Sequence, residues 1–142
     1  MDILHKVAMK SSTAEVYEAL TTAKGIAGWW TTDASGDGDE LGGVLRFGFA
    51  DVKVVDLTPG TRVRWEVVAG PDEWVGTRVN FDVNQVDDYA VVMFKHEGWR
   101  EPGEMMHHCS TKWATFLLSL KSLIETGKGT PAPDDVRIDN WN

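Results

Sequence analysis

The hydrophobic residues between positions 104 and 125 recur with the spacing of a helix. At 100° per residue they fall on a single arc of roughly 120°, the width of a stripe that faces a protein core. The members of this arc are Met105, Met106, Cys109, Trp113, Phe116, Leu117, Leu120, Leu123 and Ile124. Only Leu118 breaks the pattern, and Pro102 and Gly127 supply start and stop signals. We therefore expect one long helix from about residue 103 to about residue 126. No second helix of comparable length is visible upstream, so its partner must be a sheet.

The N-terminal part of the chain predicts a strand followed by two short helices. Apolar and polar residues alternate from Ile3 to about Lys10, as in a half-buried strand. The sequence Ser-Thr-Ala-Glu at residues 12–15 is a capping box and begins the first short helix. A second short helix is expected over Lys24–Trp30. The Gly-rich, acidic stretch Thr31–Gly43 then reads as a loop with at most a short strand.

The middle of the chain predicts an antiparallel meander, because short alternating runs are separated by turn signals. The five candidate strands are Val44–Ala50, Val52–Leu57, Arg62–Val68, Trp74–Gln85 and Tyr89–Glu97. Their alternation collects apolar residues on one face, and charged or polar residues such as Arg64, Asn80 and Lys95 on the other. The apolar face comprises Leu45, Phe47, Phe49, Val63, Trp65, Val67, Val75, Val79, Phe81, Val83, Val92 and Phe94. The fold class is therefore α+β, with a sheet of six or seven antiparallel strands wrapped around one long C-terminal helix.

Length and charge limit the partners of this chain. The 142 residues predict a single domain over residues 1–130, followed by an extended tail over 131–142 that packs through Trp141 only. The net charge of −8 argues against nucleic acid and anionic membranes, which need a basic surface. The N-terminus has no signal-peptide pattern and no apolar run is long enough to span a membrane, so we expect a soluble cytoplasmic protein.

Several segments together resemble a known family. They are the Trp29-Trp30 pair after two short helices, Gly42-Gly43 before a Phe-rich strand, Thr58-Pro59-Gly60 leading to Trp65, the sequence His96-Glu97-Gly98-Trp99, and above all WATFLLSLKSL at Trp113–Leu123 followed by Glu125-Thr126-Gly127-Lys128-Gly129. In these features the chain is similar, roughly from Ile3 to Pro131, to homologues of the C-terminal domain of the heat-shock protein 90 ATPase activator. That family belongs to the START-like helix-grip superfamily (SRPBCC), which also includes the birch-pollen allergen. The resemblance implies a cavity between sheet and long helix but no catalytic set, because the superfamily includes lipid binders, hormone receptors, polyketide cyclases, oxygenase subunits and co-chaperone domains.

The candidate ligand-binding residues are those that the pattern directs toward such a cavity. They are Trp29, Trp30, Phe47, Trp65, Phe81, Phe94, His96, Met106, Cys109 and Trp113. His96 is the strongest polar candidate, because it shares the parity of Val92 and Phe94 near the end of its strand. The alternative is a buried neutral histidine whose hydrogen bonds go to the backbone. Cys109 lies on the helical arc, where an inert buried thiol competes with a nucleophile. The tryptophans are either core residues or a ligand platform.

Neither a metal site nor a cofactor site is expected. His107 and His108 point 100° apart on a helix and lie outside the apolar arc, which disfavours shared ligation. The acidic loop does not fit a calcium-binding EF-hand, since position 12 counted from Asp37 is Gly48 rather than a glutamate.

Three functions therefore stay open. The first is the binding of an apolar small molecule or lipid in a cavity, which the aromatic residues and the lack of a catalytic constellation favour. The second is a cavity enzyme of the cyclase or hydrolase type, in which His96 acts with a carboxylate or water. The third is a co-chaperone that stimulates heat-shock protein 90, although 142 residues leave no room for the N-terminal domain that precedes this one in the protein that names the family. We expect a monomer or a weak homodimer.

Overall fold

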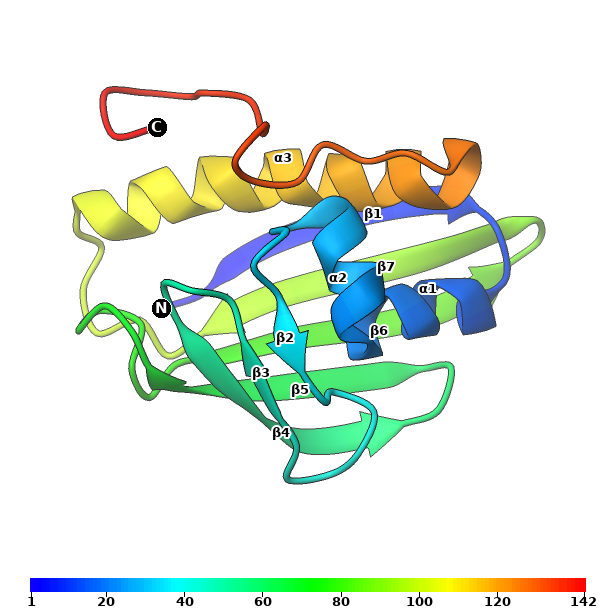
Figure 1. Cartoon of the computed structure of the whole chain (residues 1–142), viewed down its shortest axis with the longest axis horizontal. Coiled ribbons are helices and arrows are strands. Elements are labelled where there is room, and N and C mark those ends of the chain that lie inside the picture. Colours follow the sequence, from blue (N-terminus) through cyan, green and yellow to red (C-terminus); the bar gives the residue numbers. More distant parts are fainter.

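Seven antiparallel strands form one sheet in the order β1-β7-β6-β5-β4-β3-β2 (Figure 1). The computed structural model describes residues 1–142. The strands are β1 (Ile3–Lys10), β2 (Ser35–Gly36), β3 (Val44–Arg46), β4 (Asp51–Thr58), β5 (Arg62–Ala69), β6 (Arg78–Val86) and β7 (Tyr89–Glu97). The helices are α1 (Thr13–Thr21), α2 (Ala23–Trp29) and α3 (Glu104–Thr126). This is the helix-grip arrangement that the sequence predicts.

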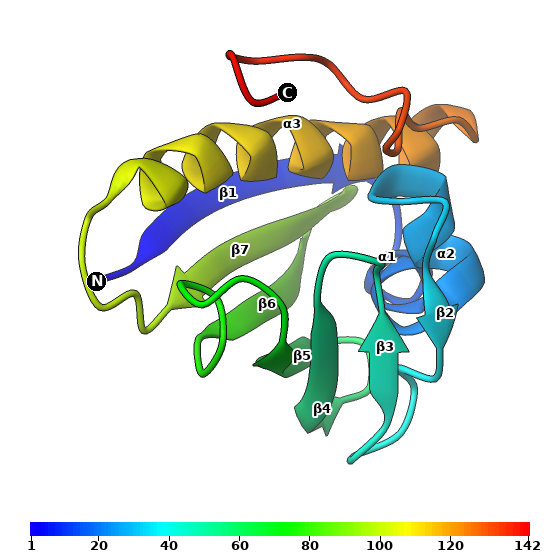
Figure 2. The ribbon, with the colours of Figure 1, turned by 60° about the vertical axis from the view of Figure 1, so that its left-hand side comes forward.

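The long helix α3 lies along β1, over the concave face of the sheet (Figure 2). Its apolar stripe is buried as predicted, since Trp113 is 2% exposed and Leu120 is fully buried. Leu118, the residue that breaks the stripe, is 60% exposed. Gly127 ends the helix in the left-handed conformation, with φ of 85°. At the other end Gly103 is the N-cap, so Pro102 lies just before the helix rather than inside its first turn.

The short helices α1 and α2 cover the part of the concave face that α3 leaves open. Half of the expected capping box is present, because the Ser12 hydroxyl accepts a hydrogen bond from the Glu15 amide at 3.3 Å. The Glu15 carboxylate accepts from the Ser11 hydroxyl instead of reaching back to the Ser12 amide. The indole of Trp29 donates to the Ala19 carbonyl at 2.9 Å, which joins the two helices within the core.

Two strands are shorter than predicted, and two apolar side chains leave the buried face as a result. The predicted strand Trp74–Gln85 begins only at β6, because the residues before it form a turn in which the Thr77 amide donates to the Trp74 carbonyl. Val75 in that turn is 38% exposed. Similarly, β3 ends early because Gly48 has a φ of 90°, and Phe49 in the following turn is 46% exposed. In both places the period-2 alternation of the sequence continues beyond the residues that pair in the sheet.

The C-terminal tail was predicted to pack through Trp141 only, and this is wrong. Trp141 is 45% exposed, whereas other parts of the tail are tightly held. Ala132 forms a short parallel bridge next to Trp30, whose carbonyl accepts from the Ala132 amide at 2.7 Å. Further on, the Asp135 side chain is only 3% exposed, because it pairs with Lys112 of α3. The tail therefore returns along α3 (Figure 1) and completes one side of the site described next.

Candidate functional site

A cavity of about 270 Å³ opens beside the N-terminal half of α3. It is enclosed by α3, the residues that follow α2, the turn between β3 and β4, the loop between β5 and β6, and the tail. The lining residues are Trp30, Thr31, Phe49, Pro71, Trp74, Met105, His108, Cys109, Lys112, Trp113, Phe116, Ala132, Asp135 and Asn142. Its walls are therefore mainly apolar, and its charged groups come from only α3 and the tail.

Aromatic side chains form the inner wall of the cavity. Trp30 and Trp113 lie with their ring centroids 4.8 Å apart, and Trp74 stacks on Trp113 with the centroids at 6.2 Å. Phe49 meets Trp74 edge to face at 5.1 Å. Such contacts hold aromatic rings in fixed orientations. The wall is thus a rigid apolar surface rather than a collapsible one.

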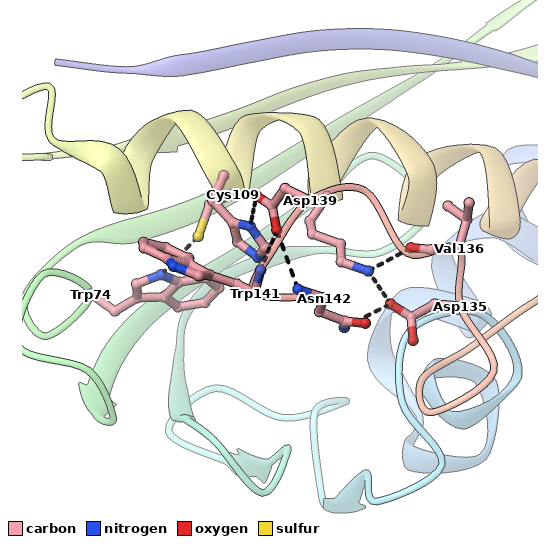
Figure 3. A network of polar contacts seen from close by, with 9 residues as sticks. Trp74, Cys109, Asp135, Val136, Asp139, Trp141 and Asn142 are labelled. Atoms are coloured by element: carbon pink, nitrogen blue, oxygen red, sulfur yellow. Dashed lines mark hydrogen bonds and ion pairs between the residues drawn. The ribbon is translucent and has the colours of Figure 1, made fainter.

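A buried ion pair closes the opposite side of the cavity. The Lys112 ammonium donates to the Asp135 carboxylate and to the Val136 carbonyl, the latter at 2.7 Å (Figure 3). The side chains of Lys112 and Asp135 are 9% and 3% exposed. Removing one partner of such a pair would leave an uncompensated buried charge. Lys112 therefore requires an anion at this position.

A second pair of side chains, one helical turn before Lys112 on α3, holds the end of the tail. His108 Nδ1 lies 2.6 Å from the carboxylate of Asp139, which also accepts hydrogen bonds from the amides of Trp141 and Asn142. The hydrogen bond to His108 is the main reason that the pKa of Asp139 lies below its usual value. The neighbouring His107 turns away and bonds the Gly103 carbonyl at 2.8 Å.

His96 is fully buried in a chain of hydrogen bonds and does not line the cavity. Its Nδ1 accepts from the indole of Trp113 at 3.1 Å. Nε2 consequently carries the ring proton and donates to the Thr77 hydroxyl at 2.8 Å, and that hydroxyl donates to the Trp74 carbonyl at 2.6 Å. Burial lowers the pKa of His96 to about 3. His96 is thus a neutral residue that fixes two walls of the cavity, and its partners are mainly side chains rather than the expected backbone.

Cys109 lines the cavity as an unreactive thiol. Its sulfur accepts a hydrogen bond from the indole of Trp74 at 3.4 Å (Figure 3). Burial raises the pKa of the Cys109 thiol to about 11, so the nucleophilic thiolate is scarce at neutral pH. This environment matches the inert alternative.

Three of the ten candidate residues line the cavity, namely Trp30, Cys109 and Trp113. The candidates outside the lining are Trp29, Phe47, Trp65, Phe81, Phe94, His96 and Met106. Most of these fill the centre of the space between sheet and helices, where Trp65 and Phe81, for example, are fully buried and 5.1 Å apart. The cavity therefore lies at the rim of that space, because aromatic side chains occupy its middle.

Sequence reasoning missed two groups of lining residues, namely those that turns and the tail bring to the site and several that lie on α3. They include Phe49, Trp74, Met105, His108, Lys112, Phe116, Ala132, Asp135 and Asn142. Met105 and Phe116 were on the predicted helical arc and could have been included. The spacing of His108 and Lys112, four residues apart beside that arc, is the signal that could have indicated a charged contact on the same face.

Two other kinds of site are not found in the structure. No group of three or more histidine, cysteine, aspartate or glutamate side chains is arranged to hold a metal ion. None of the helices combines the length and the apolar character that crossing a membrane requires.

Comparisons with known proteins place this architecture among its relatives. The solution structure of the Aha1 dimer from Colwellia psychrerythraea is 41% identical in sequence, with 91% of this chain and 99% of that chain covered and a TM-score of 0.82. A crystal structure of a protein from Staphylococcus saprophyticus is 16% identical, with coverages of 93% and 98% and a TM-score of 0.77. CalU16 from Micromonospora echinospora is 20% identical, with coverages of 89% and 77% and a TM-score of 0.74. The latter two similarities show the fold alone.

No match was found among curated proteins. The family model described as activator of Hsp90 ATPase homolog 1-like protein matches residues 10–125. That match spans most of the chain, from the last residue of β1 through α1, α2 and strands β2 to β7 to nearly the end of α3. Together with the Colwellia relative, it shows that this chain belongs to the activator of Hsp90 ATPase homolog 1-like family.

Proposed function

We propose that the protein binds an apolar small molecule or lipid in the cavity beside α3. The observation that carries this proposal is the rigid aromatic wall of Trp30, Trp74 and Trp113 facing a cavity of about 270 Å³. Small-molecule sites typically combine apolar walls with a few polar groups that orient the ligand. Lys112, His108 and Asn142 are polar groups of this kind.

The enzyme alternative finds little support in the geometry. His96, the residue on which that alternative depends, has both ring nitrogens engaged in hydrogen bonds. Its pKa of about 3 also makes it a poor proton acceptor at neutral pH. The Cys109 thiol is protonated there as well. A binding function needs neither group to react.

A thermal screen of fatty acids, flavonoids and aromatic polyketides tests the proposal. A ligand that binds only the folded state stabilises it by about 2.7 kcal/mol at a hundredfold excess over Kd. For a domain of this size the expected rise in Tm is on the order of 5 to 10 °C. Tryptophan emission should change with it, because Trp30, Trp74 and Trp113 line the cavity.

A matched pair of variants locates the binding site. Ala132→Trp places a large side chain in the cavity lining and should abolish the Tm shift of the best ligand. Ala14→Trp makes the same change at an exposed position of α1 and should preserve the shift. A screen without any stabilising ligand, or a hit that Ala132→Trp does not affect, would contradict binding in this cavity.

We infer a second copy of this chain as a further partner. The support is the Colwellia relative, which is described as a dimer and is 41% identical to this chain. Sedimentation velocity at several concentrations measures this directly. We expect a concentration-dependent rise toward the dimer mass, and a purely monomeric protein at all concentrations would refute the inference.

Stimulation of the ATPase of heat-shock protein 90 is the second candidate function. It is favoured by the description of the matching family model, activator of Hsp90 ATPase homolog 1-like protein. We place it after small-molecule binding, because the outer face of the sheet carries exposed ion pairs.

A further inference from the structure

The contacts of the tail suggest which class of ligand the cavity takes. Up to Ala132 the tail is anchored by backbone hydrogen bonds to Trp30 and Thr32. Beyond that residue it has few apolar contacts, since Val136 is 55% exposed and Trp141 is 45% exposed. Residues 133–142 are held to α3 through two of its side chains. Lys112 pairs with Asp135 and donates to the Val136 carbonyl, and His108 pairs with Asp139 and lies with its ring 5.0 Å from that of Trp141.

The Lys112 ammonium is the one lysine or arginine group in the cavity lining. It lies against the ring of Phe116, 5.7 Å from the ring centroid, and is therefore at the border of the apolar wall and the tail. Because this charge is buried, the site is stable only while a carboxylate or another anion faces it. Asp135 supplies that anion from a segment whose contacts with α3 are made through Lys112 and His108.

We propose that the cavity selects amphipathic carboxylates, whose carboxylate replaces Asp135 at Lys112 while the apolar body lies against Trp30, Trp74 and Trp113. The proposal rests on the proposed binding function and adds the chemistry of the ligand. Asp135 is an internal stand-in for the ligand's carboxylate, and residues 133–142 move away from α3 when the ligand binds. A neutral ligand would leave the Lys112–Asp135 pair intact and gain only the apolar contacts. A cationic ligand would meet no unpaired anion among the lining residues, since Asp135 is already paired.

Three probes that share one ring system and differ in the head group test this selectivity. They are 2-naphthoate, 2-naphthylmethanol and 2-naphthylmethylammonium, and their affinities are measured by titration calorimetry with the full-length protein. We expect the carboxylate to bind at least tenfold more tightly than the alcohol, and the ammonium compound to bind most weakly. A charged partner at a buried lysine accounts for this order.

Variants of the ion pair separate the head-group effect from apolar binding. Asp135→Asn removes the internal competitor and should increase the affinity for 2-naphthoate about tenfold, with less than a threefold change for the alcohol. Asp134→Asn is the matched control, because it makes the same charge change at an exposed neighbour and should change neither affinity. The double variant Lys112→Met with Asp135→Asn leaves no unpaired buried charge and should remove the preference for the carboxylate.

Nuclear magnetic resonance reports on the movement of the tail. The backbone amides of residues 133–142 should become mobile on the nanosecond timescale when 2-naphthoate binds and should stay ordered with the alcohol. If the carboxylate and the alcohol bind equally, or if Asp135→Asn does not alter carboxylate affinity, the head-group proposal is wrong and binding in the cavity still stands. If none of the three probes binds and the wider screen also fails, both proposals are refuted.

Discussion

His96 illustrates how a single buried residue organises the site without belonging to its lining. Its ring connects Trp113 of α3 to Thr77, and through Thr77 to the carbonyl of Trp74. Two aromatic walls that come from distant parts of the chain are thereby fixed relative to each other. Fully satisfied polar networks of this kind rigidify a core. The polar residue that the sequence suggested as a ligand contact thus affects the cavity only through the tryptophans that it positions.

The pKa of His96 gives a testable dependence of stability on pH. An unfolded histidine takes up a proton below about pH 6.5, whereas His96 in the fold does so only near its pKa of about 3. Between these values the unfolded state binds more protons, so stability falls as the pH falls. From pH 7 to pH 4.5 this one residue should cost about 2 to 3 kcal/mol. Urea unfolding at both pH values should show this additional loss for the wild type relative to His96→Gln. Equal losses in the two proteins would mean that His96 is protonated in the native state.

Leu120 and Leu118 form a matched pair for the packing of α3. Leu120 is fully buried and Leu118 is 60% exposed on the same helix. Leu120→Ala removes buried apolar atoms and leaves a cavity, so it should lower the free energy of unfolding by about 2 to 5 kcal/mol. Leu118→Ala should change it by less than about 0.5 kcal/mol. Denaturant unfolding of both variants measures the difference, and similar effects of the two changes would contradict the packing of α3 on the sheet.

At the scale of elements, the periodicity of the sequence predicted the helices and strands that bury one face over many residues. The stripe of α3 and the alternation in β5 and β7 are set by burial over many residues, and the predicted bounds lie within a residue of those observed for α3. The cavity could not be predicted in the same way, because turns and the tail supply much of its lining. Phe49 and Trp74 follow the alternating pattern of strand residues but lie in turns. This alternation predicts the face of the sheet on which a residue lies, and it does not predict where a space between sheet and helix stays unfilled. The tail has no apolar period at all, and it is placed by charges on α3.

We expect the rest of the domain to fold without the end of the C-terminal tail. Deleting residues 133–142 should preserve cooperative unfolding and the far-ultraviolet spectrum, because the core residues lie before residue 126. Without the tail, the Lys112 ammonium would be exposed to water and would not be a buried, unpaired charge. The free energy of unfolding should therefore fall by less than about 3 kcal/mol. A second deletion, of residues 131–142, also removes the Ala132 bridge to Thr31 and the hydrogen bond from the Ala132 amide to the Trp30 carbonyl, and should cost more stability. Loss of the cooperative transition in the shorter deletion would show that the tail belongs to the folding unit.

At the scale of the whole molecule, the two faces of the sheet have opposite characters. The concave face is filled by the core, and the convex face carries ion pairs between neighbouring strands. Arg62 lies 3.3 Å from the Asp82 carboxylate and 3.5 Å from that of Asp56, and Arg78 lies 3.7 Å from the Glu66 carboxylate. Exposed apolar residues such as Met93 are separated on β1 and β7 by lysines, for example Lys6 directly opposite. The convex face therefore lacks a continuous apolar patch of the kind that stable protein interfaces place at their centre.

This distribution of charge leads to a prediction about the co-chaperone candidate. Added to purified heat-shock protein 90, the protein should leave the rate of ATP hydrolysis unchanged, because the ion pairs exposed on the convex face add little affinity to offset the cost of association. The net charge of −8 further disfavours acidic partner surfaces, and this effect weakens with salt. The assay should therefore be run at low and at physiological ionic strength, with an established activator as the positive control. A several-fold stimulation by this protein would make the co-chaperone function the leading one. If the variant Ala132→Trp abolished that stimulation, the partner would contact the cavity and the tail rather than the convex face of the sheet.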